Sequence, residues 1–288
     1  MTAIAPIDWS RQVCLVTGAN SGVGAAITRA LARLDASVIM ACRDRQRGTA
    51  ARSAIVADLP AARLHLEIAD LRRLADVQQL AARVRGQFAA IDVLINNAGV
   101  YRAALERTPD GFEVTFAVNH LAHFALTLGL LDALAAARGS ILNITSDAHR
   151  AGKLARAPIE AIARGEGRYR GVQAYCDAKM ANVSFTAGLV ARHGARGITA
   201  AALHPGALNT GIWDQNDDLL SKVMRVFRFL LKPASDGAAA ALGALQRPRD
   251  ELQGAYLDRL RKSAPAPMAL ERALVDELWS VSERLVST

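Results

Sequence analysis

The feature that most constrains this chain is a glycine-rich segment, residues 17–24, between a predicted strand and a predicted helix. Residues 13–16 are continuously apolar, which is typical of a buried strand, and residues 23–34 repeat apolar side chains with helical periodicity. A turn of this kind points free backbone N–H groups and the positive end of the helix dipole at one place. We therefore expect an anion to bind there, most often the pyrophosphate of a dinucleotide.

Three glycines have separate tasks in such a turn. Gly18 can adopt backbone angles closed to other residues, Gly22 lets a ligand approach the main chain, and Gly24 lets helix and strand pack closely. The expected cofactor contacts in this turn also include Asn20, Ser21 and Val23. The spacing is G-x-x-x-G-x-G, not the commoner G-x-G-x-x-G, so a tight turn without a ligand is the alternative.

Apolar runs and helical patterns alternate along the whole chain. Strands are predicted at residues 13–16, 37–41, 64–67, 93–95, 140–145, 199–203 and 255–257. Helices are predicted at residues 25–34, 74–84, 112–134, 172–192, 235–245 and 269–286. The alternation predicts an α/β fold, a single Rossmann-type doubly wound parallel sheet with helices on both faces, in one domain of residues 1–288. Ligands of such sheets bind beyond the carboxyl ends of the strands.

The composition of the chain limits the classes of partner that we expect it to bind. The net charge is +8, but the arginines are scattered and aromatic residues make up only 5%, so no nucleic-acid partner is expected. The odd number of cysteines, with no metal-ligand spacing, fits a reducing compartment without a metal site. These cysteines are Cys14, Cys42 and Cys176. We see no signal peptide and no transmembrane segment, so a cytoplasmic location is expected.

Charged residues follow the second predicted strand, where dinucleotide folds select between NAD and NADP. An acidic residue about 20 positions after the glycines binds the ribose 2′-hydroxyl of NAD, whereas an arginine accommodates the 2′-phosphate of NADP. Cys42 cannot bind the diol and Arg43 can pair with a phosphate, which favours NADP(H) over NAD(H). The alternative is an exposed ion pair in which Asp44 neutralises Arg43.

Polar residues follow the third and fourth predicted strands as well. Asp70, with Leu71 beside it, can accept a hydrogen bond from an adenine amino group or can cap the next helix. The residues after the fourth strand can hold the backbone close to a nucleotide, or can form a simple turn. They are Asn97, Ala98 and Gly99.

Residues 112–134 predict one long helix that contains Asn119, His120 and His123. Asparagine is unfavourable in mid-helix, because its side chain competes for backbone hydrogen bonds, so Asn119 is a functional candidate. The two histidines have no evident third metal ligand, and we expect them in the core or on a helix face.

We expect three further polar residues to face one cleft at the carboxyl edge of the sheet. Ser146 stands at the carboxyl end of the fifth predicted strand. Tyr175 and Lys179 lie four positions apart in the helix predicted at 172–192, and four positions turn a helix by about 400°, so they share one face. An incidental aromatic–lysine pair is the alternative.

The sixth predicted strand ends before Pro205 and Gly206, a turn that can bring backbone to the cofactor, with Thr210 following. Residues 212–232 mix apolar and basic side chains, which predicts a substrate flap at about 207–235. A helix on a membrane surface has the same signature, so peripheral membrane contact stays open.

Together these residues resemble the short-chain dehydrogenase/reductase family. The family's motifs occur in order over nearly the whole chain: Thr17-Gly-Ala-Asn-Ser-Gly-Val-Gly24, Asp70, Asn96-Asn-Ala-Gly99, Asn119, Ser146, Tyr175-x-x-x-Lys179 and Pro205-Gly206. Ala41-Cys-Arg-Asp44 and Val118-Asn-His-Leu-Ala-His-Phe124 are similar to the retinol dehydrogenase and WW-domain oxidoreductase-like group. Because Ala122 stands where that group often has glycine and no N-terminal anchor is seen, we expect a substrate other than a retinoid.

The resemblance implies an NADP-dependent oxidoreductase that transfers a hydride between nicotinamide and a carbonyl, or a primary or secondary alcohol, of an apolar small molecule. Tyr175 would supply the proton, and Lys179, together with the positive nicotinamide of the oxidised cofactor, would favour its phenolate. Lys179 would also bind the cofactor. Ser146 would bond the substrate oxygen, and Asn119 would hold a water linked to the lysine. A non-catalytic NADP-sensing interaction protein and an epimerase or dehydratase are the alternatives, and homo-oligomerisation stays open.

Overall fold

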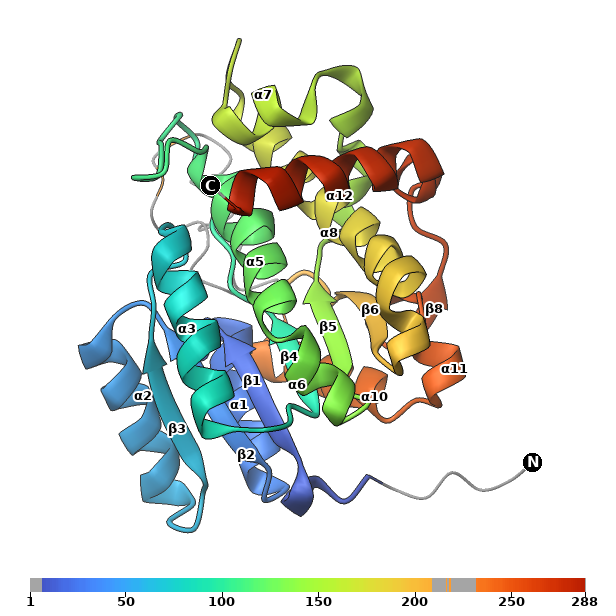
Figure 1. Ribbon diagram of the computed structural model, residues 1–288. Helices are drawn as coiled ribbons and strands as arrows, with labels where there is room; N and C mark the ends of the chain where they lie inside the picture. The colour runs from blue at the N-terminus through green and yellow to red at the C-terminus, as the bar shows by residue number, and fades with distance from the viewer. Residues whose placement is uncertain (1–6, 209–215, 217, 219–231, 288) are drawn as a thin grey trace.

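One eight-stranded sheet runs through the computed structural model, which describes residues 7–208, 216, 218 and 232–287. The strand order is β3-β2-β1-β4-β5-β6-β7-β8, and helices cover both faces of the sheet (Figure 1). Strands β1 to β7 are parallel to their neighbours, and β8 pairs antiparallel with β7. The predicted α/β fold of Rossmann type is confirmed. Thr210 and most of the predicted flap at 207–235 lie outside the described residues.

All seven predicted strands are present. The strands are β1 (Val13–Thr17), β2 (Ser37–Cys42), β3 (Leu64–Ile68), β4 (Val93–Asn96), β5 (Ser140–Ile144), β6 (Thr199–His204), β7 (Tyr256–Asp258) and β8 (Arg261–Ser263). The exposed, basic strand β8 was not predicted, because it has no apolar run and forms only by pairing with β7. Central strands such as β2 are buried along their whole length, because helices lie on both sides of them.

The helices divide into two layers. Apart from the segment at residues 114–136, which is described below, the α-helices are α1 (Gly22–Arg33), α2 (Arg45–Asp58), α3 (Leu74–Gln87), α7 (Ile159–Arg164), α8 (Gly171–His193), α10 (Ala234–Leu245), α11 (Arg249–Leu252) and α12 (Arg272–Val286). Short 3₁₀ turns are η1 (Trp9–Arg11), η3 (Asp147–Ala151), η4 (Leu154–Arg156), η5 (Gly194–Arg196) and η8 (Pro267–Leu270). Apolar residues of α1 and α10 share one core cluster, and those of α3, α8 and α12 share another.

The helix predicted at residues 112–134 is present, but it is not one regular helix. The segment forms α4 (Val114–Phe116), a π-helical stretch η2 (Ala117–Leu121), α5 (Ala122–Gly129) and α6 (Leu131–Ala136). Asn119 lies in the π-helical stretch, and its side-chain amide bonds the backbone of Val100, outside the helix. The side chain therefore holds the loop after β4 and does not compete for the backbone groups of its own helix.

The last predicted helix begins later than expected, because residues 267–270 form the separate turn η8. Helix α12 then lies across α5 and α8 (Figure 1). The Trp279 ring packs edge-on against Phe124, with ring centroids 5.0 Å apart. The C-terminal helix is therefore part of the core on this side of the sheet.

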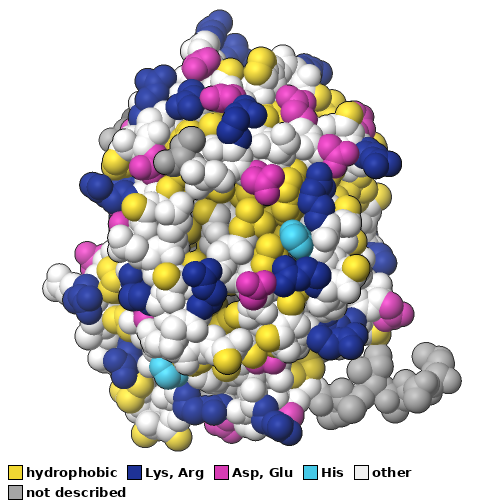
Figure 2. Space-filling model, viewed as in Figure 1, with side chains coloured by type: hydrophobic (Ala, Val, Ile, Leu, Met, Phe, Trp, Pro, Cys, Tyr) yellow, Lys and Arg dark blue, Asp and Glu magenta, His cyan; other side chains and the backbone are white. Residues whose placement is uncertain are grey.

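Charges of both signs are mixed on the surface that Figure 2 shows. On this face (Figure 2), Lys and Arg side chains are interspersed with Asp and Glu and form no basic stripe. All three cysteines are buried free thiols. Across the described residues we find no helix that is long and apolar enough to cross a bilayer, and no group of three or more acidic, His or Cys side chains that could hold a metal.

Candidate active site

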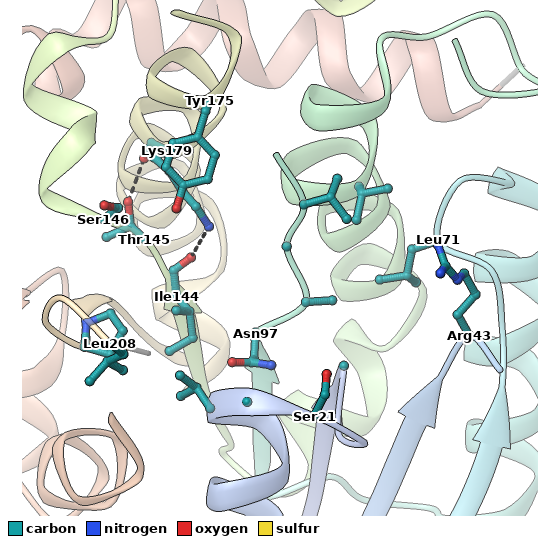
Figure 3. Close-up of a pocket in the computed structure, with 18 of the residues that line it drawn as sticks. Ser21, Arg43, Leu71, Asn97, Ile144, Thr145, Ser146, Tyr175, Lys179 and Leu208 are labelled. Atoms are coloured by element: carbon teal, nitrogen blue, oxygen red, sulfur yellow. Dashed lines mark hydrogen bonds between the residues drawn. The ribbon is translucent and has the colours of Figure 1, made fainter. Parts of the chain in front are cut away.

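A cavity of ≈690 Å³ opens at the carboxyl edge of the sheet, beside the crossover between β1 and β4. Figure 3 shows Tyr175, Lys179 and Ser146 at one end, Arg43 and Leu71 at the other, and Ser21 and Asn97 between them. The predicted residues that line it are Gly18, Asn20, Ser21, Gly22, Val23, Arg43, Asp70, Leu71, Asn97, Ala98, Gly99, Ser146, Tyr175, Lys179, Pro205 and Gly206. Gly24 and Asn119 lie behind its wall.

The glycine turn has the geometry that a phosphate group requires. Gly18 and Gly22 adopt left-handed angles, with φ of 65° and 51°. A Cβ on Gly24 would lie 2.3 Å from the carbonyl oxygen of Gly18, so only glycine lets the helix start this close to the strand. Ser21 occupies the N-cap position of α1 but makes no side-chain capping hydrogen bond. The first N–H groups of α1 therefore stay available to an anion, and the turn fits a pyrophosphate.

Thr17, to which the sequence pattern gave no role, joins this turn to the loop after β4. Its hydroxyl oxygen accepts the N–H groups of Asn97 and Ala98, each at 2.9 Å. The Asn97 side chain returns a hydrogen bond to the Thr17 carbonyl at 2.8 Å. The hydroxyl also lies 2.9 Å from Nε2 of buried His123. His123 is thus a core histidine, as expected.

The end of the cavity at Arg43 is rich in arginine. Arg43 and Arg47 both line the cavity and are exposed. The carboxylate of Asp44 accepts the backbone N–H of Arg47 at 2.8 Å and caps helix α2. The structure therefore favours Asp44 as the cap of helix α2 over Asp44 as the ion-pair partner of Arg43.

Asp70 is held by a neighbouring arginine. The guanidinium of Arg72 donates to its carboxylate, with Nη2 2.6 Å from Oδ2. Burial alone would raise the pKa of Asp70, but the hydrogen bonds from Arg72 hold it below its usual range. Asp70 does not cap helix α3, because Asp110 accepts the N–H of Leu74 instead. The capping alternative is wrong, and Asp70 lines the cavity as a carboxylate.

Tyr175 and Lys179 project from one side of helix α8 into the cavity (Figure 3). The Lys179 ammonium lies 5.6 Å from the centre of the Tyr175 ring. Lys179 is only 3% exposed, and its Nζ donates to the carbonyl oxygen of Ile144 at 3.2 Å. The two side chains meet at the end of β5, where Ser146 also lies.

Burial dominates the ionisation of this pair. Loss of solvent raises the pKa of Tyr175 to about 12, although a hydrogen bond with Ser146 acts in the opposite direction. Burial lowers the pKa of Lys179 to about 8. Burial thus disfavours the charged form of each of the two side chains. That Lys179 and the positively charged nicotinamide together favour the phenolate stays a prediction.

Asn119 fixes the loop that passes beside the lysine. Its Oδ1 accepts the N–H of Val100 at 2.7 Å, and its Nδ2 donates to the Val100 carbonyl at 3.0 Å. A Cβ on Gly99 would lie 3.2 Å from Asn119 Oδ1 and 3.6 Å from Lys179 Nζ. Asn119 thus shapes the cleft wall next to Lys179, and its role as a water ligand stays a prediction.

Several residues near Tyr175 in the cavity were missed by sequence reasoning. Tyr101 packs edge-on against Tyr175, with ring centroids 6.2 Å apart, and its hydroxyl donates to Asp218 at 3.0 Å. Arg102 and His204 line the cavity. No spacing rule identifies them, because only the fold brings the loop after β4 and the end of β6 beside α8.

Comparisons with known proteins agree with this geometry. Residues 12–158 match the family model described as short chain dehydrogenase. Retinol dehydrogenase 12 of Mus musculus is 36% identical over 96% of this chain and 86% of that protein. The WW domain-containing oxidoreductase of Drosophila melanogaster is 33% identical over 97% of this chain and 69% of that protein.

Solved structures have the same fold. An uncharacterised protein of Mycobacterium paratuberculosis superimposes with a TM-score of 0.77 at 30% identity, over 100% of this chain and 98% of that chain. A short chain dehydrogenase of Burkholderia cenocepacia, solved in complex with NADP, has a TM-score of 0.66 at 26% identity, over 87% of this chain and 96% of that chain.

Proposed function

Because this chain belongs to the short-chain dehydrogenase/reductase family and is an oxidoreductase of that family, we propose that it transfers a hydride between NADP(H) and an apolar substrate. The group that reacts is a carbonyl or a primary or secondary alcohol. The observation that carries this proposal is the meeting of Tyr175, Lys179 and Ser146 at one end of the cavity. Apolar side chains in the cavity wall, including Val100, Ile144 and Leu208, support the substrate class.

Each residue at the catalytic end has a distinct task. Ser146 holds the substrate oxygen by a hydrogen bond, which strengthens as negative charge grows there. Tyr175 donates its phenolic proton to that oxygen, or removes it when an alcohol is oxidised. Lys179 places a cation beside the ring and binds the cofactor ribose. The nicotinamide cofactor, when bound, exchanges the hydride and in its oxidised form adds positive charge next to the phenol.

The choice of NADP over NAD rests on the arginines at the other end. Arg43 and Arg47 line the cavity there, and Asp44 is engaged as a helix cap. Arginine pairs with phosphate by charge-assisted and often bidentate hydrogen bonds. The NADP complex of the B. cenocepacia relative is consistent with this choice. We further propose that the protein acts in the cytoplasm, which subcellular fractionation would test.

The experiment is to follow NADPH absorbance with a panel of apolar ketones, aldehydes and quinones. Tyr175→Phe should lower turnover about a thousandfold, because general acid–base catalysis is worth about 10²–10⁴. NADPH binding should stay nearly unchanged. Tyr101→Phe is the matched control, because it removes a hydroxyl from the neighbouring ring that bonds Asp218 instead. Equal loss of turnover and NADPH binding in Tyr175→Phe would mean that the residue is only structural.

A further inference from the structure

A buried histidine beside the serine has no task in the mechanism above. His149 lies in η3, which begins directly after Ser146, and its side chain is 0% exposed. Its Nδ1 lies 2.8 Å from the carbonyl oxygen of Ser146. Its Nε2 lies 3.0 Å from the backbone nitrogen of Ala266. The imidazole therefore bridges two segments that are 117 positions apart in sequence.

These two partners determine the tautomer of the ring. A carbonyl oxygen can only accept, so Nδ1 of His149 must carry the proton. A backbone N–H can only donate, so Nε2 must be unprotonated. A positively charged ring would set a second N–H against that of Ala266. The ring is also packed against Tyr256 of β7, with centroids 4.8 Å apart, so it has little freedom to turn.

We infer that His149 is a positioning residue for Ser146, an inference that rests on the proposed function. The Ser146 carbonyl accepts both the ring N–H and the backbone N–H of His149, the second at 3.0 Å. These two bonds fix the peptide group that follows Ser146. The hydroxyl of Ser146 meanwhile forms a hydrogen bond with Tyr175. A displacement of about 1 Å in a catalytic group can cost a hundredfold in rate. Ala266 holds the far side of the ring and so anchors this arrangement to the segment before η8.

Two substitutions separate the two ring nitrogens. The side-chain amide of asparagine can reach the place of Nδ1, so His149→Asn can keep the bond to Ser146. The longer glutamine can place its oxygen near Nε2, so His149→Gln can keep the bond to Ala266 instead. We expect His149→Gln to lower kcat about 10- to 100-fold with NADPH affinity unchanged, and His149→Asn to stay within about threefold of the wild type. Equal kcat in the two variants, or a lower kcat in His149→Asn, would overturn the inference.

A double-mutant cycle tests the route through Ser146. If His149 acts by placing this serine, His149→Gln should have no further effect on kcat in a Ser146→Ala background. Additive losses would contradict it. Nitrogen NMR of the wild-type ring tests the arrangement even if both variants fail to fold. We expect the His149 ring to carry a proton on Nδ1 and none on Nε2 at pH 7. The opposite tautomer would refute the proposed hydrogen bonds to Ser146 and Ala266. Failure of the proposed function would appear separately, as turnover retained in Tyr175→Phe.

Discussion

The two ends of the cavity are built on opposite principles. At the Arg43 end, the charged side chains of Arg43 and Arg47 are exposed, and the nearby Asp44 accepts the backbone N–H of Arg47. At the catalytic end, Lys179 is buried, and its neighbours come from β5, α8 and the loop after β4. Exposed charges are inexpensive to keep, whereas a buried ammonium lowers stability unless it is neutralised. The burial of Lys179 therefore lowers the stability of the fold, whereas the exposed Arg43 and Arg47 do not.

The largest effect is expected from Lys179→Met. Turnover should fall about a thousandfold or more, as for other groups that assist proton transfer. The free energy of unfolding at pH 7 should rise by up to about 3 kcal/mol, because the pKa of the buried lysine is lowered from 10.5 to about 8.

The sign follows from proton binding. Between pH 8 and 10.5 the unfolded chain binds the lysine proton and the folded chain does not, so wild-type stability rises with pH across this window. The gain in Lys179→Met should therefore shrink as pH rises, which urea unfolding at several pH values would measure. Exposed Lys262→Met should leave stability unchanged, and a variant of Lys179 that is less stable at pH 7 would break the comparison.

The next effect tests the glycine turn. Gly24→Ala should lower the free energy of unfolding by about 3 kcal/mol, because its Cβ would lie 2.3 Å from the carbonyl oxygen of Gly18. Gly86→Ala in helix α3 is the control, since a Cβ there meets nothing within 4 Å. It should gain up to about 1 kcal/mol from helix propensity. Thermal and urea unfolding of both variants give the measurement, and equal stabilities would contradict the close approach.

His123 links the two ends, because its ring lies 2.9 Å from the Thr17 hydroxyl and 3.1 Å from the Asn119 carbonyl. Burial lowers its pKa to about 4, so the unfolded chain binds a proton between pH 4 and 6.5 that the folded chain does not. Stability is therefore lost as pH falls through this window, by about 2 kcal/mol at pH 5. His123→Gln should remove this part of the acid sensitivity; an unchanged pH profile would show that the ring titrates normally.

The smallest effect is expected at the exposed arginines. Arg43→Gln and Arg47→Gln should each lower the preference for NADP over NAD about tenfold, because a charge-assisted hydrogen bond contributes about 1.5 kcal/mol. Arg45→Gln is the matched control, since Arg45 is exposed on helix α2, like Arg47, but does not line the cavity. Steady-state kinetics with both cofactors measure the ratio. If the preference for NADP over NAD is unchanged in Arg43→Gln, Arg43 does not select the cofactor.

The sequence by itself determined the parts of this protein that depend on neighbouring residues. Buried strands appear as apolar runs, the glycine turn has backbone angles that glycine favours, and Tyr175 and Lys179 share a face because a helix repeats every 3.6 residues. Sequence periodicity located the helical segment at residues 112–134 but missed its π-helical stretch, in which the Asn119 side chain bonds the backbone of Val100. Local spacing carries no information about such a contact.

Only the tertiary structure decided how the catalytic groups ionise and what holds them in place. The pKa values of Tyr175 and Lys179 depend on burial by elements distant in sequence, and this burial opposes both charges. The pairing of His149 with Ala266 arises because β7, β8 and η8 return to the end of β5. Desolvation and long-range hydrogen bonds follow from the packing of the whole chain, and therefore no motif encodes them.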